Sequence, residues 1–171
     1  MRVPQRTPSD GTVSWNNAKQ KAKRDNVNCE WGGKWDIRNG KIVLFNTGTG
    51  CSELTENGLK HLITFPKGTR RRWHTHRARD MWWPSVEDIS YKSKHAQLLI
   101  TRHGTWVWHH VNPDTTNKEQ LKNRTLQMIK DMETATKGSA WQWGNAMFVI
   151  RDYIKDVVNH GVKVKFFEDL P

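Results

Sequence analysis

The sequence contains few cysteines, no long apolar run and no excess of acidic residues. Among its 171 residues are two cysteines, Cys29 and Cys51, which allow at most one bridge and so exclude a disulfide scaffold. No apolar run approaches the roughly 18 residues that a membrane-spanning helix needs, and the first residues lack the apolar core of a secretion signal. We therefore expect an intracellular, cytoplasmic protein that has no membrane partner.

Apolar residues are also scarce, at 35% of the chain, and the mean hydropathy is −0.85. Ten tryptophans are nevertheless far more than a disordered polar chain carries. A chain of this length buries roughly 70% of its unfolded surface in one core. We predict a loose arm over residues 1–13 and a single domain over residues 14–171.

Acidic residues are outnumbered by basic ones, since 17 Asp and Glu face 28 Lys and Arg, for a net charge of +11. Residues before Asp114 hold 19 of the basic and 9 of the acidic side chains. The densest segment runs from Lys67 to Arg79 and contains six cations and no carboxylate. Such a run is either a solvated face or a contact surface for nucleic acid or an acidic partner. The residues assigned to this patch are Lys67, Arg70, Arg71 and Arg72.

Hydrophobic periodicity and turn residues predict a sheet followed by helices. Ser14 is placed to cap a helix that ends near Asn26, and Asn39-Gly40 marks a hairpin turn within residues 30–45. Pro84-Ser85 marks the start of another helix. Further strands are expected near residues 61–65, 71–74, 97–101 and 105–111, a helical extension over about 115–160, and a closing strand at 162–166. The fold class is α/β of the α+β type, with a single mixed β-sheet flanked by helices.

Two histidines within the basic segment are the strongest candidates for metal chemistry. His74 and His76 are two residues apart, which on a strand places both imidazoles on one face. Asp88, in the first turn of the helix expected after Pro84-Ser85, offers a carboxylate. Three such ligands leave a fourth position open, as in catalytic zinc sites. We therefore predict one Zn²⁺ per chain, whereas Cys29 and Cys51 lack metal-ligand spacing and are interpreted as idle or buried thiols.

The order of these residues resembles the JAMM/MPN (JAB-type) family of zinc metallopeptidases, including its prokaryotic and viral-like members. The family motif is a Glu, then His-Ser/Thr-His, then Ser-x-x-Asp. Here it reads Glu30, His74-Thr75-His76 and Ser85-Val86-Glu87-Asp88. The resemblance extends over about residues 28–111 and implies an MPN/cytidine-deaminase-like architecture.

The resemblance also implies roles for these residues. His74, His76 and Asp88 would hold zinc, Ser85 would donate a hydrogen bond to the oxyanion, and Glu30 would act as the general base. Glu53 and Glu56 are alternative bases. The implied reaction is hydrolysis of a peptide or isopeptide amide, with a ubiquitin-like tail as one possible substrate. The loop before Pro84 is expected to line the substrate groove through Arg77, Arg79, Trp82 and Trp83, unless the two tryptophans fill the core beneath it.

The same residues are compatible with two other functions. A nickase would use the histidines to hold Mg²⁺ or Mn²⁺ and a tyrosine in Tyr91-Lys92-Ser93-Lys94 as the nucleophile. A non-catalytic component on the same fold would bind nucleic acid or assemble with partners through its basic face.

Overall fold

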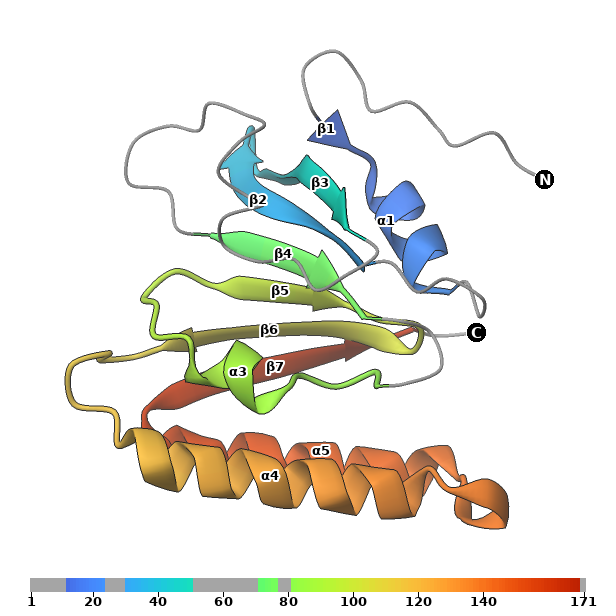
Figure 1. Ribbon diagram of the computed structural model, residues 1–171, viewed down its shortest axis with the longest axis vertical. Coiled ribbons are helices and arrows are strands. Elements are labelled where there is room, and N and C mark those ends of the chain that lie inside the picture. Colours follow the sequence, from blue (N-terminus) through green and yellow to red (C-terminus); the bar gives the residue numbers. More distant parts are fainter. Residues whose placement is uncertain (1–11, 24–29, 51–70, 77–80, 170–171) are drawn as a thin grey trace. The chain divides into compact units, whose positions relative to one another are not determined.

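The computed structural model describes residues 12–23, 30–50, 71–76 and 81–169 (Figure 1). Its strands form one mixed seven-stranded sheet in the order β1-β3-β2-β4-β5-β6-β7, in which β4 and β5 are parallel. The predicted α+β fold class is therefore confirmed. The elements are β1 (Thr12–Val13), α1 (Trp15–Ala22), β2 (Glu30–Arg38), β3 (Lys41–Gly50), β4 (Arg72–Thr75), α3 (Val86–Ser90), β5 (Gln97–Ile100), β6 (Gly104–His110), α4 (Lys118–Ala135), α5 (Trp143–Val157) and β7 (Val162–Glu168), with short 3-10 helices at Gly138–Ala140 and Val158–His160.

The chain groups into two compact units, which are described separately. Of the described residues, the first unit contains those up to Trp82 and Leu98–Thr105. The second contains Trp83–Gln97 and the described residues from Trp106 onward. The predicted strand at 61–65 lies outside the described residues, as do residues 1–11 of the predicted arm.

The first unit is built on the predicted hairpin. β2 and β3 pair antiparallel up to Arg38 and Lys41, and the turn residues Asn39 and Gly40 both have positive φ, 54° and 74°. This is the conformation for which Asn-Gly was expected. Ser14 caps α1 as predicted, because its hydroxyl accepts a hydrogen bond from the Asn17 amide.

Bulky aromatic residues fill the core of the first unit. Trp35 and Trp73 are buried, and the Trp73 indole donates a hydrogen bond to the Phe45 carbonyl at 3.0 Å. β1 pairs with β3 through Val13 and Leu44, which are also buried. The Trp73 hydrogen bond joins β4 to the hairpin, and the pairing of β1 extends the sheet beyond β3.

The second unit carries the helices predicted for the last third of the chain. α4 buries Leu121, Thr125, Met128 and Met132 at helical spacing. α5 begins at Trp143 and buries Ala146, Ile150, Tyr153 and Val157. The predicted closing strand is present as β7, which follows Gly161, a residue in the left-handed conformation.

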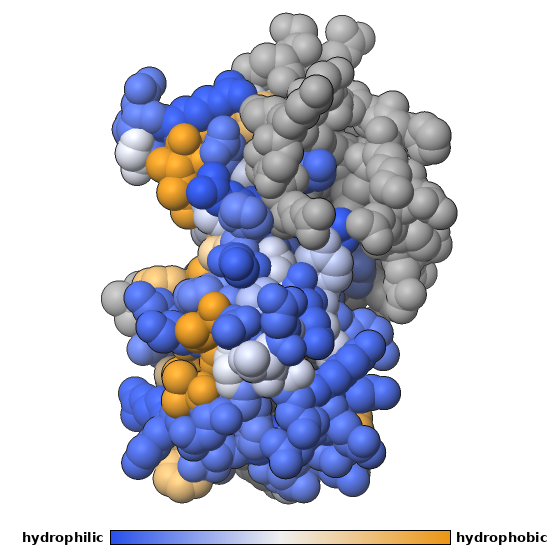
Figure 2. All heavy atoms as spheres, turned by 90° about the vertical axis from the view of Figure 1, so that its left-hand side faces the viewer, coloured by the Kyte–Doolittle hydropathy of each residue, from blue (hydrophilic) through white to orange (hydrophobic). Residues whose placement is uncertain are grey.

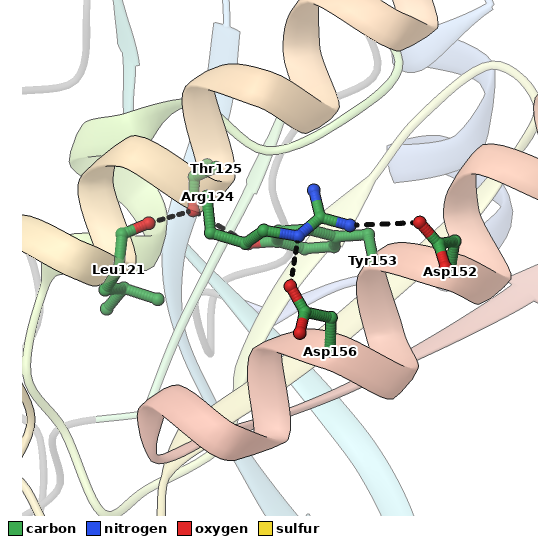
Figure 3. A network of polar contacts seen from close by, with 6 residues as sticks. All are labelled: Leu121, Arg124, Thr125, Asp152, Tyr153 and Asp156. Carbon is green, nitrogen blue, oxygen red and sulfur yellow. Dashed lines mark hydrogen bonds and ion pairs between the residues drawn. The ribbon is translucent and has the colours of Figure 1, made fainter.

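A polar network joins α4 to α5 within this unit (Figure 3). The buried hydroxyls of Thr125 and Tyr153 are hydrogen-bonded at 2.9 Å. Arg124 lies over the Tyr153 ring, with 5.3 Å between the guanidinium carbon and the ring centroid, and it pairs with Asp156 and Asp152 of α5. Burial raises the pKa of Tyr153 to about 12, so this hydroxyl stays protonated in the core.

Apolar side chains reach the surface at scattered positions. Figure 2 shows a mostly hydrophilic face on which apolar atoms appear as small separate patches. Among the described residues, no helix is both long and apolar enough to cross a membrane.

Candidate metal centre

β4 carries His74, and His76 follows directly after the last residue of the strand, Thr75. Trp73 and Thr75 alternate with His74 and are buried on the opposite side. There, the Thr75 hydroxyl accepts a hydrogen bond from the Trp31 amide at 3.0 Å. Because Trp73 and Thr75 are anchored in this way, the strand cannot rotate about its axis, and His74 and His76 project from the opposite face.

The two imidazoles are close enough to share one ion. The Nε2 atoms of His74 and His76 are 3.2 Å apart, and their rings meet at an interplanar angle of 60°. Two nitrogens bound to the same tetrahedral zinc at about 2.0–2.1 Å would be about 3.3 Å apart. The distance also fits a hydrogen bond between two neutral rings, so the pair is suited to a metal without being specific for one.

Asp88 is held by the first turn of α3. The Ser85 hydroxyl accepts a hydrogen bond from the Asp88 amide at 3.0 Å, and Asp88 Oδ2 accepts one from the Ser85 amide at 2.9 Å. This is a capping box, and it accounts for the Ser-x-x-Asp spacing on structural grounds alone. It also sets the direction of the Asp88 carboxylate.

His110 on β6 fixes the end of α3 next to Asp88, a contact that the sequence analysis missed. Its Nε2 is 2.7 Å from the Ile89 carbonyl oxygen, so this nitrogen carries the hydrogen and donates. The ring is buried, and burial lowers the pKa of His110. The hydrogen bond to the Ile89 carbonyl opposes this shift, and Lys92 and His109 lower the pKa further. The only signal in the sequence is the alternation of His110 with Trp106 and Trp108, which predicts an inward-facing position.

The three predicted ligands form a group. One potential donor atom from each of His74, His76 and Asp88 lies within 4.8 Å of the other two. His76 is buried and the other two are half-buried, so this donor set is partly withdrawn from water. Two imidazole nitrogens and one carboxylate oxygen are the donor types of catalytic zinc sites, and the residues present therefore fit the predicted ion.

Glu30 lies on the histidine side of the sheet without joining this group. Gly32 is the cross-strand partner of His74, and Glu30, two residues away on β2, projects to the same face. Gly32 is buried and has no side chain on that face. The group of three potential ligands does not include Glu30.

Two predicted substrate contacts, Trp82 and Trp83, are described, whereas many of the other predicted residues lie outside the described ranges. Trp82 and Trp83 are buried, with exposed fractions of 7% and 3%, and the Trp82 ring packs edge-on against His103 at 4.9 Å. This burial favours the interpretation in which both rings fill the core, while their contact with substrate stays a prediction. Outside the described residues are Cys29, Cys51, Glu53, Glu56, Lys67, Arg70, Arg77 and Arg79.

Two members of the predicted basic patch are described. Arg71 forms an ion pair with Asp36 at 3.0 Å and lies over the Trp35 ring, so part of its charge is used within the protein. Arg72 is half-buried and opposite Lys34 across β2 and β4. Whether this patch binds nucleic acid stays a prediction.

No family model matches the chain, and neither a curated protein nor a solved structure matches it.

Proposed function

We propose that the protein is a zinc-dependent metallopeptidase or isopeptidase that hydrolyses a peptide or isopeptide amide. The observation that carries the proposal is the group formed by His74, His76 and Asp88, whose donor atoms lie within 4.8 Å of one another. Three protein ligands leave a position open for water or substrate, which distinguishes catalytic zinc sites from structural ones. The resemblance of the motif to the JAMM/MPN family supplies the reaction class.

The ligand residues are held in place by contacts that do not involve an ion. β4 holds His74, His76 follows directly after its last residue, and the capping box fixes the direction of the Asp88 carboxylate. Zinc, when bound, lowers the pKa of a coordinated water to about 7 and polarises a carbonyl group. A site ordered in advance loses little conformational entropy when it binds the ion.

Glu30 and Ser85 are assigned to proton transfer and charge stabilisation. Glu30 projects to the same side of the sheet as His74, where its carboxylate can accept a proton from water and deliver it to the leaving amine. The Ser85 hydroxyl accepts a hydrogen bond in the capping box, so its own hydrogen remains to be donated to the carbonyl oxygen of the substrate as charge develops there.

The proposed substrate is a protein or peptide, with a ubiquitin-like tail as one candidate. The proposed compartment is the cytoplasm, because two cysteines suit a reducing environment.

The test of the proposed activity is a substitution that keeps the metal and removes the base. Glu30→Gln is expected to retain zinc and to lower kcat/KM at least about 100-fold, the usual contribution of a general base. The readout is hydrolysis of fluorogenic peptides and of a Lys-ε-amide-linked peptide by the zinc-loaded protein. Glu87→Gln is the matched control, because Glu87 is an exposed acid in the first turn of α3.

Two results would count against the proposal. A Glu30→Gln protein with unchanged zinc content and unchanged kcat/KM removes Glu30 from the mechanism. A zinc-loaded wild-type protein that cleaves none of these amides contradicts the assignment as a peptidase.

A further inference from the structure

One face of β6 and β7 in the second unit presents basic and aromatic side chains to solvent. The two strands are neighbours in the sheet and run in opposite directions (Figure 1). The Val111 amide donates to the Gly161 carbonyl near one end, and Trp106 packs against Phe166 farther along. These two contacts set the pairing of the strands.

Alternation along the strands separates two faces. Trp106, Trp108, Val162 and Val164 are buried on one of them. The other face, called here the outer face, consists of Val107 and His109 on β6 and Lys163, Lys165 and Phe167 on β7. Both lysines are exposed, and Phe167 is 57% exposed.

The outer face is a local concentration of positive charge. Burial lowers the pKa of His109, and the charges of Lys163 and Lys165 lower it further. The neighbouring acid on β7, Glu168, turns to the opposite face, where it accepts a hydrogen bond from the Trp143 indole at 2.6 Å. Its carboxylate is therefore directed away from the two lysines.

Cations beside an exposed aromatic ring on a sheet are the combination that single-stranded nucleic acids use. Lysines contact phosphates, and a flat exposed ring stacks on a base that is not paired. An acidic peptide would use the lysines but would gain nothing from stacking on Phe167. A duplex does not present its base faces, so it would not use the ring either. The net charge of +11 gives any polyanion a favourable approach.

We propose that the outer face of β6 and β7 binds single-stranded nucleic acid, with Lys163 and Lys165 contacting phosphates and Phe167 stacking on a base. This site goes beyond the proposed metallopeptidase activity and does not depend on it, because it shares no residue with the metal centre.

The test measures fluorescence anisotropy of fluorescein-labelled 12-nucleotide oligo(U) and oligo(dT) with the full chain at 50 and 200 mM NaCl. Lys163→Gln/Lys165→Gln is expected to raise Kd at least tenfold at 50 mM NaCl. It should also reduce the slope of log Kd against log[salt] by about 1.4, since each phosphate contact to a single strand contributes about 0.7. Phe167→Ala is expected to raise Kd about 5- to 150-fold, the range found for losing one base-stacking contact.

Matched controls make the same chemical changes elsewhere in the unit. Lys118→Gln/Lys122→Gln removes two exposed lysines from α4, and Phe148→Ala removes a phenylalanine on α5 that is 74% exposed. Both controls are expected to leave Kd within twofold of wild type. Circular dichroism melting of every variant confirms that it is folded.

The proposal is overturned if the wild-type chain binds neither oligonucleotide. It is also overturned if the Lys163/Lys165 and Phe167 variants bind as tightly as the controls, which would locate binding elsewhere, such as the segment from Lys67 to Arg79. Equal displacement of the oligonucleotide by polyglutamate, together with no effect of Phe167→Ala, would assign the face to an acidic protein instead.

Discussion

Gly161 is a residue at which the backbone leaves little choice of side chain. Its φ is +83°, in the left-handed region, and a Cβ placed there would meet the Thr116 hydroxyl oxygen at 3.1 Å. Thr116 in turn lies 3.4 Å from Nδ1 of His110, the residue that holds the end of α3. The turn before β7 is therefore tied by packing to the support of Asp88.

Gly161→Ala is expected to lower the free energy of unfolding by about 1–2 kcal/mol, because an L side chain is strained in the left-handed region. Gly144→Ala is the matched control, since a Cβ there has no atom within 4 Å. That variant should be unchanged or up to about 1 kcal/mol more stable. Urea denaturation measures both, and equal destabilisation of the two variants would contradict the argument.

The buried imidazole of His110 makes stability depend on pH. Burial lowers the pKa of His110 in the folded protein below its ordinary value of 6.5. At a pH between the folded and the unfolded pKa, the unfolded chain therefore binds more protons than the folded one. The contribution of the neutral, buried His110 to the free energy of unfolding is fully present above about pH 6.5 and is lost as the pH falls below that value.

His110→Gln removes this titration and keeps a side-chain donor for the Ile89 carbonyl. We expect the free energy of unfolding of the variant to fall less steeply than that of wild type between pH 6.5 and 5. Above pH 7.5 the two curves should run parallel. Urea melts in EDTA measure this without any contribution from bound metal. An identical decline below pH 6.5 would show that His110 does not carry the effect.

At the scale of secondary-structure elements, α4 and α5 are joined by the polar network around Arg124. The Arg124 side chain is 15% exposed, whereas its partners Asp156 and Asp152 are 44% and 67% exposed. The guanidinium depends mainly on Asp156, because Asp152 is mostly solvated and its contact is longer, at 3.4 Å. Exposed ion pairs contribute little, but a partly buried charge that loses its partner is costly.

Asp156→Asn is expected to destabilise the protein by about 1–3 kcal/mol, since the guanidinium would lose its charged hydrogen-bond acceptor. Asp152→Asn, the matched control on the same helix, should cost less than about 1 kcal/mol. Thermal melts at low and moderate salt measure both changes. An equal loss of stability in the two variants would show that the contact of Arg124 with Asp156 contributes no more than an exposed ion pair does.

Local sequence signals predicted the elements that local interactions determine. Asn39-Gly40 identified the hairpin because few other dipeptides accept two positive φ values, and Ser85 identified the start of α3 through its capping box. The pairing of Val13 with Leu44 was not predictable in this way, because it joins a two-residue strand to a distant one. The same holds for Arg124 and Asp156, which are 32 residues apart.

In the candidate site, too, the positions set by local sequence were predictable and those set by tertiary packing were not. Strand alternation placed His74 and His76 on one face, which the structure confirms, and the order of the motif supplied Asp88. The contact of His110 with the Ile89 carbonyl had no signal in the sequence beyond an inward-facing position. The burial of Trp82 and Trp83 depends on tertiary packing, which left both interpretations open.

At the scale of the whole molecule, the net charge of a segment does not show where its charged side chains lie on the folded surface. From Asp114 onward the chain holds nine basic and eight acidic residues, which is close to balance. Even so, strand alternation gathers Lys163 and Lys165 on the outer face and turns Glu168 away from them. A charge count along the sequence therefore cannot locate the basic surfaces of the folded protein.

We propose that the chain binds one catalytic zinc through His74, His76 and Asp88. Binding to the folded state alone also stabilises it, by about 2.7 kcal/mol when free zinc is at 100 times its Kd. The thermal midpoint should therefore rise with zinc in wild type. It should not rise in His74→Ala/His76→Ala, whereas His160→Gln, at the end of the 3-10 helix before β7, should behave as wild type.

The most direct measurement is the zinc content of the purified chain by mass spectrometry after dialysis against metal-free buffer. We expect one zinc per chain in wild type and in His160→Gln, and less than about a tenth of that in His74→Ala/His76→Ala and in Asp88→Ala, because the one or two ligands that remain cannot hold the ion tightly. Wild-type protein without zinc, or an unchanged zinc content in the His74/His76 variant, would contradict it.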